Sequence, residues 1–260
     1  MRVTLLGTGT STGVPVIGCE CPVCQSEDAR DKRMRCSCYI EVNGVSVLVD
    51  SGPDFRQQAL THGINKVDAV LYTHHHFDHV AGMDDLRPFL FDNRMPIPCF
   101  AKPNSATVIK DMYRYIFTDG SYPGVPRLRL LDTVGEFSLF GRYDSSKHVV
   151  VKPIEVSHGN LQMFGYRIGK FGYVTDTNYI SDESIAQLEG LDVLILDALR
   201  DEPHPMHFTI DEAIQVAVRI GAKKTYFIHM THTVKHSDTE SRLPDGIYLG
   251  YDGLAIEVND

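Results

Sequence analysis

Apolar residues in this chain form short runs, and several of these runs end at polar side chains. The run 67–71 predicts a buried strand, and apolar positions at helical spacing over 80–90 predict a helix. Between them lies the stretch THHHFDH, residues 73–79. An alternating segment from Cys36, an Asn-Gly pair and a second apolar run ending at Asp50 predict a β-hairpin. The histidine-rich stretch is therefore expected where a strand ends and a helix begins.

The same patterns predict strands and helices along the rest of the chain. Further strands are expected at 2–6, 97–101, 134–140, 149–157, 163–168, 171–175, 193–196 and 225–228, with a closing strand or pair in 247–258. Helices are expected at 54–62, 103–116 and 209–220. The segment 118–127 has the composition of a loop that could overhang a pocket lined by Tyr115 and Tyr122, although surface packing is the favoured role of both tyrosines. Without a linker or a repeat, residues 1–260 are expected to form a single domain.

The histidine-rich stretch has the side chains of a metal site. In an extended segment, side chains two residues apart point the same way, so His74 and His76 can meet at one point. The turn into the following helix then presents Asp78 and His79 to a second point nearby. Imidazole and carboxylate ligands suit divalent metals, zinc above all. The alternative, a solvated histidine-rich loop, does not explain why the cluster follows a buried strand directly.

Other predicted strands also end in histidine or aspartate. His158, Asp176 and His229 each follow a strand, and Asp50 ends the second strand of the hairpin. Alone, each would more often be an ordinary core or surface polar residue. Ends of neighbouring strands gather at one edge of a sheet, where ligands bind in α/β proteins. We therefore expect these side chains to lie near the histidine-rich stretch.

Cysteines fall into two groups. Cys19, Cys21 and Cys24 lie within six residues on a loop and are typical of a structural zinc site whose fourth ligand comes from elsewhere; small loop residues without metal are the alternative. The others are expected to pack in the core, namely Cys36, Cys38 and Cys99.

Composition limits the classes of function. The chain has 260 residues, 43% of them hydrophobic, and a formal net charge of −9. This charge argues against a nucleic-acid partner, whereas a metal site could still attract a small anionic substrate. No apolar run is long enough to span a membrane and no secretory signal is recognisable, so we expect a cytoplasmic protein with reduced thiols and no membrane partner. Exposed strand edges are compatible with a homodimer.

The ordered motifs resemble those of the metallo-β-lactamase superfamily. THHHFDH matches its T-H-x-H-x-D-H motif. VDSG, before this stretch, and VSHGN, VTDTN and FIHMTH, after it, match the superfamily's other metal-site motifs in order. The resemblance implies an α/β fold, a four-layer αβ/βα sandwich of two mixed sheets flanked by helices. It also implies a dinuclear site. One ion would be held by His74, His76 and His158, the other by Asp78, His79 and His229, with Asp176 bridging both ions and Asp50 supporting the ligands.

A narrower resemblance is to the PhnP group of cyclic phosphodiesterases. These proteins share the C-x-C-x-x-C loop, and the group's fourth structural zinc ligand corresponds to His232, with His236 as the rival. The HFTIDEA stretch also resembles this group, and its His207 fits the general acid better than the neighbouring His204. PqqB, a protein of PQQ biosynthesis, has a similar cysteine loop but a longer chain.

This resemblance implies hydrolysis of small phosphate diesters, with cyclic phosphates such as phosphoribosyl cyclic phosphate as the expected type. A hydroxide bridging two zinc or manganese ions would attack phosphorus, His207 would protonate the leaving oxygen, and Asp78 would act at the catalytic centre as well as binding metal. One structural zinc would occupy the cysteine loop. The alternatives are a thioester hydrolase of the glyoxalase II type, an RNA 3′-processing endonuclease, and a metal-binding protein without catalysis.

Overall fold

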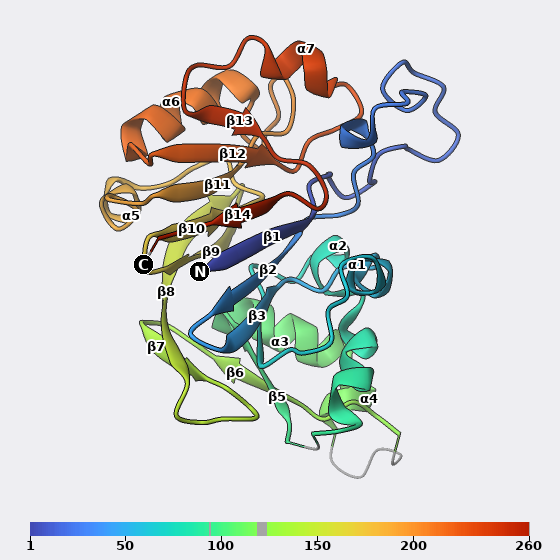
Figure 1. Cartoon of the computed structure of the whole chain (residues 1–260), viewed down its shortest axis with the longest axis vertical. Coiled ribbons are helices and arrows are strands. Elements are labelled where there is room, and N and C mark those ends of the chain that lie inside the picture. The colour runs from blue at the N-terminus through green and yellow to red at the C-terminus, as the bar shows by residue number, and fades with distance from the viewer. Residues whose placement is uncertain (94, 119–123, 260) are drawn as a thin grey trace.

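The architecture consists of two mixed β-sheets packed face to face, with helices on their outer faces (Figure 1). A computed structural model describes residues 1–93, 95–118 and 124–259. The apolar side chains between the sheets, including Leu5, Val47, Phe171 and Ile195, are buried and form the central core. The expected four-layer αβ/βα sandwich is confirmed.

The first sheet contains the predicted hairpin and the strand before the histidine-rich stretch. In spatial order it is β14 (Ala255–Glu257), β1 (Arg2–Gly7), β2 (Ser37–Val42), β3 (Val45–Val49), β4 (Ala69–Leu71), β5 (Ile97–Ala101) and β6 (Leu128–Asp132). Strands β3 to β6 are parallel, and the other pairs are antiparallel. Asn43 and Gly44 turn between β2 and β3 with φ of 51° and 77°, the left-handed conformation that a tight hairpin requires.

The second sheet carries the remaining strand-end residues. Its spatial order is β13 (Ile247–Leu249), β12 (Lys224–Ile228), β11 (Val193–Asp197), β10 (Phe171–Val174), β9 (Leu161–Ile168), β8 (His148–His158) and β7 (Phe137–Phe140). Strands β10 to β13 are parallel, whereas β7 to β10 form an antiparallel meander. The polar side chains expected near the histidine-rich stretch lie at or near the carboxyl ends of strands β3, β8, β10 and β12.

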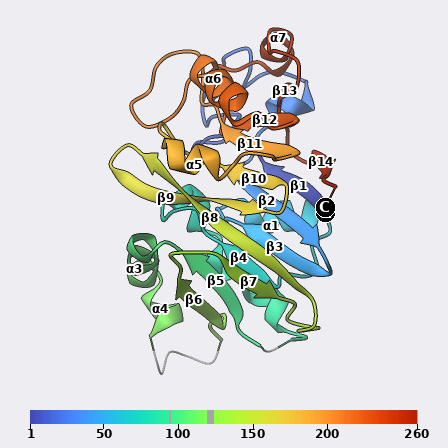
Figure 2. The same cartoon turned by 90° about the vertical axis from the view of Figure 1, so that its left-hand side faces the viewer.

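Helices cover the outer face of each sheet, as Figures 1 and 2 show. Beside the first sheet lie α1 (Phe55–Thr61), α2 (Phe77–Val80), α3 (Pro103–Met112), α4 (Arg114–Phe117) and the 3₁₀ helix Met83–Leu90. Beside the second lie α5 (Asp182–Ala186), α6 (Ile210–Ile220) and α7 (His236–Glu240). A further 3₁₀ helix spans Ala29–Asp31. Helix α6 starts with a capping box between Thr209 and Glu212 and ends at Gly221.

The helix expected over 80–90 differs from the structure. Helix α2 has only four residues, and the 3₁₀ helix Met83–Leu90 follows it. Pro88 lies inside this second segment and has no N–H to continue an α-helical ladder. The buried side chains of Met83, Leu86 and Phe89 recur every third residue, which fits a 3₁₀ helix.

Two other differences concern strands. The closing segment forms a pair of strands, but β13 joins the second sheet and β14 joins the first. Strand β6 lies just beyond the segment 118–127 and was not expected. Tyr122 lies outside the described residues, and Tyr115 donates a hydrogen bond to Asp84 at 3.1 Å.

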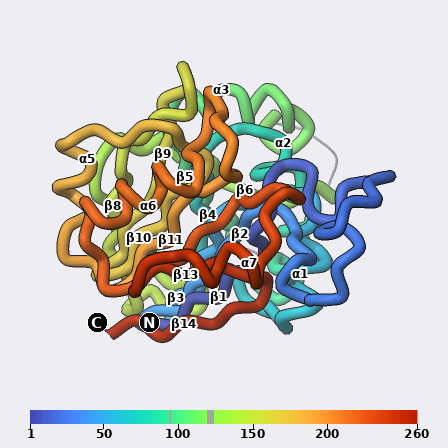
Figure 3. Tube along the Cα trace, turned by 90° about the horizontal axis from the view of Figure 1, so that it is seen from above, coloured from blue at the N-terminus to red at the C-terminus, as the bar shows by residue number. Residues whose placement is uncertain are grey.

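The two termini lie side by side (Figure 3). The amino group of Met1 donates to the carbonyl of Val258 at 3.0 Å, because β1 and β14 pair at this edge of the first sheet. Among the described residues, no helix combines the length and apolar character needed to cross a membrane.

Candidate metal centre and active site

The predicted ligands gather where strands of the two sheets end. Residues 73–79 follow β4, His158 is the last residue of β8, Asp176 follows β10 and His229 follows β12. Parallel strands bring their carboxyl ends to a common edge of a sheet. Because the two sheets pack face to face, these edges of the two sheets lie next to each other. Residues from distant parts of the chain therefore share one site.

Three imidazoles form the first group of candidate ligands. His74, His76 and His158 each offer a ring nitrogen, and these atoms lie within 4.8 Å of one another. Nε2 of His74 is 2.9 Å from Nδ1 of His76. Nδ1 of His158 lies 2.9 Å from the carbonyl of Met206, so this nitrogen carries the proton and leaves Nε2 for a metal.

The second group combines carboxylates and imidazoles. Asp78, His79, Asp176 and His229 also bring one ligand atom each to within 4.8 Å of the others. Oδ2 of Asp176 lies 3.0 Å from Nε2 of His229, 3.3 Å from Nε2 of His79 and 4.0 Å from Nε2 of His74. Asp176 therefore stands between the two groups, as the resemblance implied for a bridging ligand.

Asp50 organises the histidine-rich stretch from a fully buried position. Its carboxylate accepts hydrogen bonds from the backbone N–H and the hydroxyl of Thr73, both at 2.8 Å. It also accepts one from Nδ1 of His79 at 2.8 Å, which directs Nε2 of that ring into the second group. Gly52 lets this turn approach closely, since a Cβ there would lie 2.0 Å from the carbonyl oxygen of Asp78.

The electrostatics of the second group favour a cation. Burial alone would disfavour charge on Asp176, yet His229 and His79 hold the pKa of its carboxyl well below the usual value. Burial also opposes protonation of His229, but the carboxylate of Asp176 outweighs it and raises the pKa of His229 to about 10. The two buried carboxylates of this group, Asp78 and Asp176, therefore need a nearby positive charge. Either protonated histidines or metal ions can provide it.

Unpaired nitrogen atoms indicate that metal fits this site. Nε2 of His79 and both ring nitrogens of His229 are buried and have carboxylate oxygens 3.0–3.5 Å away, but none of these contacts has hydrogen-bond geometry among the described residues. Buried polar atoms normally have partners, so these atoms indicate a missing one. Imidazole and carboxylate are suitable donors for zinc or manganese. The arrangement therefore suits a pair of divalent ions, and the individual ligand assignments stay predictions.

The ring of His207 contacts one imidazole of each group, and its Nδ1 faces the carboxylate of Asp197. Nδ1 of His207 lies 3.3 Å from Oδ1 of Asp197, at the end of β11. The ring stacks on His229, with centroids 4.7 Å apart and an interplanar angle of 15°, and lies 4.7 Å from the ring of His158. His204, the weaker candidate, lies 5.1 Å from His207 by ring centroid and does not belong to the candidate ligand groups.

From the sequence, no role was predicted for Asp197, which directly follows the predicted strand 193–196. It is fully buried and accepts hydrogen bonds from the backbone N–H groups of Asp176 and Phe208, at 3.1 and 3.2 Å. Its position directly after an apolar strand, like that of Asp50, was the signal that could have identified it. It connects the backbone of the predicted bridging ligand with the ring of His207.

Backbone strain is concentrated in this site. Among the described residues other than glycine, positive φ angles occur at Asn43, Asp50, Asp176 and His229, and three of these four are site residues. Such conformations cost about 1–3 kcal/mol each and persist where the surrounding structure enforces them. Here the strain places carboxylate and imidazole groups at strand ends.

The cysteine loop forms a separate cluster with His232. Sγ atoms of Cys19, Cys21 and Cys24 lie 3.2, 3.5 and 3.7 Å from Nδ1 of His232. A hydrogen bond from the backbone N–H of Cys24 lowers the pKa of the Cys21 thiol to about 6, which favours a thiolate there, whereas burial raises the pKa of the Cys24 thiol to about 11. His236, the rival, is buried elsewhere and its backbone N–H donates to Asp31. Cys36, Cys38 and Cys99 are buried in the core, as expected.

Comparisons with known proteins define the class. The model of a family described as the beta-lactamase superfamily domain matches residues 46–230. The chain belongs to this superfamily, and its architecture is the metallo-β-lactamase fold, which implies divalent metals at the site described above.

Individual relatives narrow the comparison. A solved structure described as a new diphosphatase from the PhnP family is 41% identical, covers 99% of this chain and 98% of its own, and superposes with a TM-score of 0.90. A coenzyme PQQ synthesis protein B of Methylorubrum extorquens is 31% identical over 99% of this chain and its own full length. The family and the diphosphatase support a hydrolase of the metallo-β-lactamase fold.

A third relative is longer. An octanoyltransferase of Porphyromonas gingivalis is 40% identical over the whole of this chain. The match covers only 52% of that relative, so the chain spans about half of its length. The name therefore refers to a longer protein, about half of which lies outside the match with this chain.

Proposed function

We propose that the protein is a dinuclear metal-dependent phosphodiesterase that acts on small, in particular cyclic, phosphate diesters. The observation that carries the proposal is the position of Asp176 between two groups of donors, with His207 stacked above them. Two divalent ions held there would neutralise phosphate oxygens and lower the pKa of a coordinated water. The ligands proposed for these ions are the seven residues of the two groups.

The chain's own residues prepare the site for this chemistry. Asp50 and the carbonyl of Met206 hold the Nδ1 protons of His79 and His158, so both rings face the site through Nε2. Asp197 does the same for His207, whose Nε2 is then free to deliver a proton. A proton on the departing alkoxide removes the charge that makes it a poor leaving group, and such help typically contributes about 10²–10⁴-fold.

Hydrolysis of a diphosphate is the second candidate, because the PhnP-family relative at 41% identity is described as a diphosphatase. Diesters and diphosphates both require neutralisation of phosphate oxygens and protonation of a leaving oxygen, so the same groups would serve either. The octanoyltransferase relative justifies testing an octanoyl thioester as well, which also examines the glyoxalase II alternative.

The test compares these substrates on protein reconstituted with zinc or manganese. Bis(p-nitrophenyl) phosphate, a 2′,3′-cyclic nucleotide, a dinucleotide joined by a diphosphate and an octanoyl thioester would be assayed side by side. We expect turnover of the diesters and its loss below detection in Asp176→Asn. Asp192→Asn is the matched control, because Asp192 lies just before β11 at its far end, paired with Lys223 at 2.8 Å.

Two results would contradict the proposal. Turnover of the thioester alone would assign the site to acyl chemistry. Full diester turnover by Asp176→Asn, with two ions still bound per catalytic site, would remove the bridging role on which the dinuclear assignment depends. Preference for the diphosphate over every diester would select the second candidate.

A further inference from the structure

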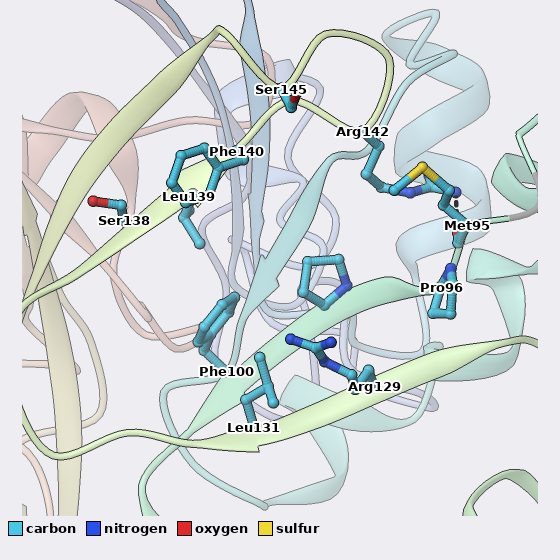
Figure 4. Close-up of a pocket in the computed structure, with 12 residues that line it drawn as sticks. Met95, Pro96, Phe100, Arg129, Leu131, Ser138, Leu139, Phe140, Arg142 and Ser145 are labelled. Carbon is cyan, nitrogen blue, oxygen red and sulfur yellow. Dashed lines mark hydrogen bonds between the residues drawn. The ribbon is translucent and has the colours of Figure 1, made fainter.

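A hollow separate from the metal centre extends along β5 from the residues just before that strand. It has a volume of about 430 Å³, within the range of small-molecule sites. Its lining combines apolar side chains with two arginines, and Figure 4 shows Met95, Phe100, Leu131, Leu139 and Phe140 with Arg129 and Arg142. The metal ligands follow the carboxyl end of β4, whereas this hollow begins before the amino end of its neighbour β5.

The hollow exists because the sandwich is open along this side. Strand β6 is the last strand of the first sheet, and β7 is the last strand of the second. Apolar side chains from the two edges meet there, with the rings of Phe100 and Phe137 stacked at 4.4 Å. Met95 and Phe140 remain 58% and 53% exposed. The space between the sheets thus opens to solvent through an apolar trough, a feature that commonly marks a binding surface.

Two arginines line the trough in a protein whose net charge is −9. Arg142 is buried, and its guanidinium donates to the backbone carbonyls of Val67, Phe89, Asn93 and Met95. These contacts hold the guanidinium in place, and the buried carboxylate of Asp68 is close enough to interact with its charge. The backbone N–H of Arg142, rather than its guanidinium, donates to Asp68, whose other oxygen lies 2.8 Å from Lys66.

Arg129 supplies the exposed cation of the trough. It is an exposed residue of β6, and Figure 4 shows its guanidinium turned toward the middle of the lining residues, near Phe100 and Leu131. Among the described residues, it forms neither an ion pair nor a side-chain hydrogen bond, unlike Arg87 or Arg114, which pair with nearby aspartates. A guanidinium beside an apolar wall matches a ligand with an anionic head and a hydrocarbon chain.

We propose that this hollow binds a single-chain fatty acid. The carboxylate would contact Arg129, and the hydrocarbon chain would lie along Phe100, Leu131, Leu139 and Phe140. Each methylene that leaves water for this apolar wall adds to the affinity, which should therefore rise with chain length until the trough is filled. This site is independent of the hydrolytic function proposed above.

Calorimetric titration with dodecanoate, below its micelle concentration, tests the proposal directly. We expect saturable binding of one molecule per chain, weaker binding of dodecanol, which has the chain without the charge, and none of acetate. Arg129→Glu should weaken dodecanoate binding by about tenfold or more, because attraction becomes repulsion. Phe140→Ser should weaken it through the lost apolar contact. Arg2→Glu is the matched control, an exposed arginine on β1 of the same sheet.

Melting temperatures of all variants would show that they fold, since the substituted residues are exposed. Absence of saturable dodecanoate binding would overturn the proposal, and so would equal affinity in Arg129→Glu and wild type. A dimer in light scattering that Phe140→Ser dissociates would also overturn it, because the trough would then be covered by a second copy of the chain. None of these results depends on the substrate of the metal centre.

Discussion

At the scale of single residues, His207 is the group whose chemistry can be separated from metal binding. Its ring contacts candidate ligands by stacking, while its Nδ1 is directed to Asp197. The seven proposed ligands form two donor groups without it, although His207 also lies within ligand distance of two further sets, one with His158 and Asp176 and the other with Asp197 and His229. A substitution there should therefore change the reaction without emptying the site.

The prediction for His207→Ala follows from this arrangement. We expect both catalytic ions to remain and turnover of a diester with an alkyl leaving group to fall by about 10²–10⁴-fold. The loss should be much smaller for a p-nitrophenolate leaving group, which departs without a proton. Metal content by mass spectrometry and turnover on the two substrates would be measured together. His204→Ala is the control, and equal losses on both substrates would instead favour a role in positioning.

At the scale of elements, two loops far apart in the sequence meet at the cysteine cluster. Residues 19–24 belong to the long connection between β1 and β2, whereas His232 lies shortly after the end of β12. The backbone N–H of Thr10, which lies in the same connection, also donates to the carbonyl of Met230 at 3.2 Å. Thiolates with one imidazole typically form a closed zinc site, which stabilises structure rather than performing catalysis.

His232→Ala should therefore lower stability while sparing the catalytic pair. We expect the zinc content to fall by one ion per chain and the melting temperature to fall by at least about 4 °C, since roughly 1 kcal/mol corresponds to 2–4 °C at this size. Diester turnover per remaining protein should stay close to that of the wild type at low temperature. His148→Ala, at an exposed position of β8, is the control. An unchanged zinc content in His232→Ala would show that the cysteines bind without this histidine.

At the scale of the whole molecule, buried polar contacts connect the cysteine-loop region to the C-terminal part of the chain. Arg33 is fully buried and paired with Asp31 at 3.1 Å, and Asp31 also accepts from the backbone N–H of His236. Burial, followed by Arg30 and Arg33, lowers the pKa of His236 to about 4. The folded protein thus holds this imidazole neutral at a pH where an unfolded chain would protonate it.

Acid stability should reflect this buried histidine. Between an unfolded pKa of about 6.5 and a folded pKa of about 4, the unfolded state binds the additional proton, so stability falls as the pH decreases through this window. The loss amounts to about 3 kcal/mol from His236 alone. His236→Gln should have a smaller decrease in unfolding free energy than wild type between about pH 6.5 and 4.5, measured by urea denaturation. Parallel curves for the two proteins would contradict the assignment.

The sequence alone predicted the candidate ligands and their order along the chain. Positions at strand ends pointed to His74, His76, His158, Asp176 and His229. This was possible because an apolar run followed by a polar residue is a local pattern that can be recognised in the sequence itself. The hairpin, most strands and the start of α6 follow from equally local signals. The resemblance of the ordered motifs supplied the four-layer fold, which single elements could not define.

Only the tertiary structure decided how distant residues meet. It brought His232 rather than His236 to the cysteines, separated β13 from β14 into different sheets and placed Asp197 between His207 and the backbone of Asp176. The trough between β6 and β7 also depends on which strands end each sheet. These features depend on pairing and packing between segments far apart in the chain, whose free energy is not encoded in any local pattern of residues.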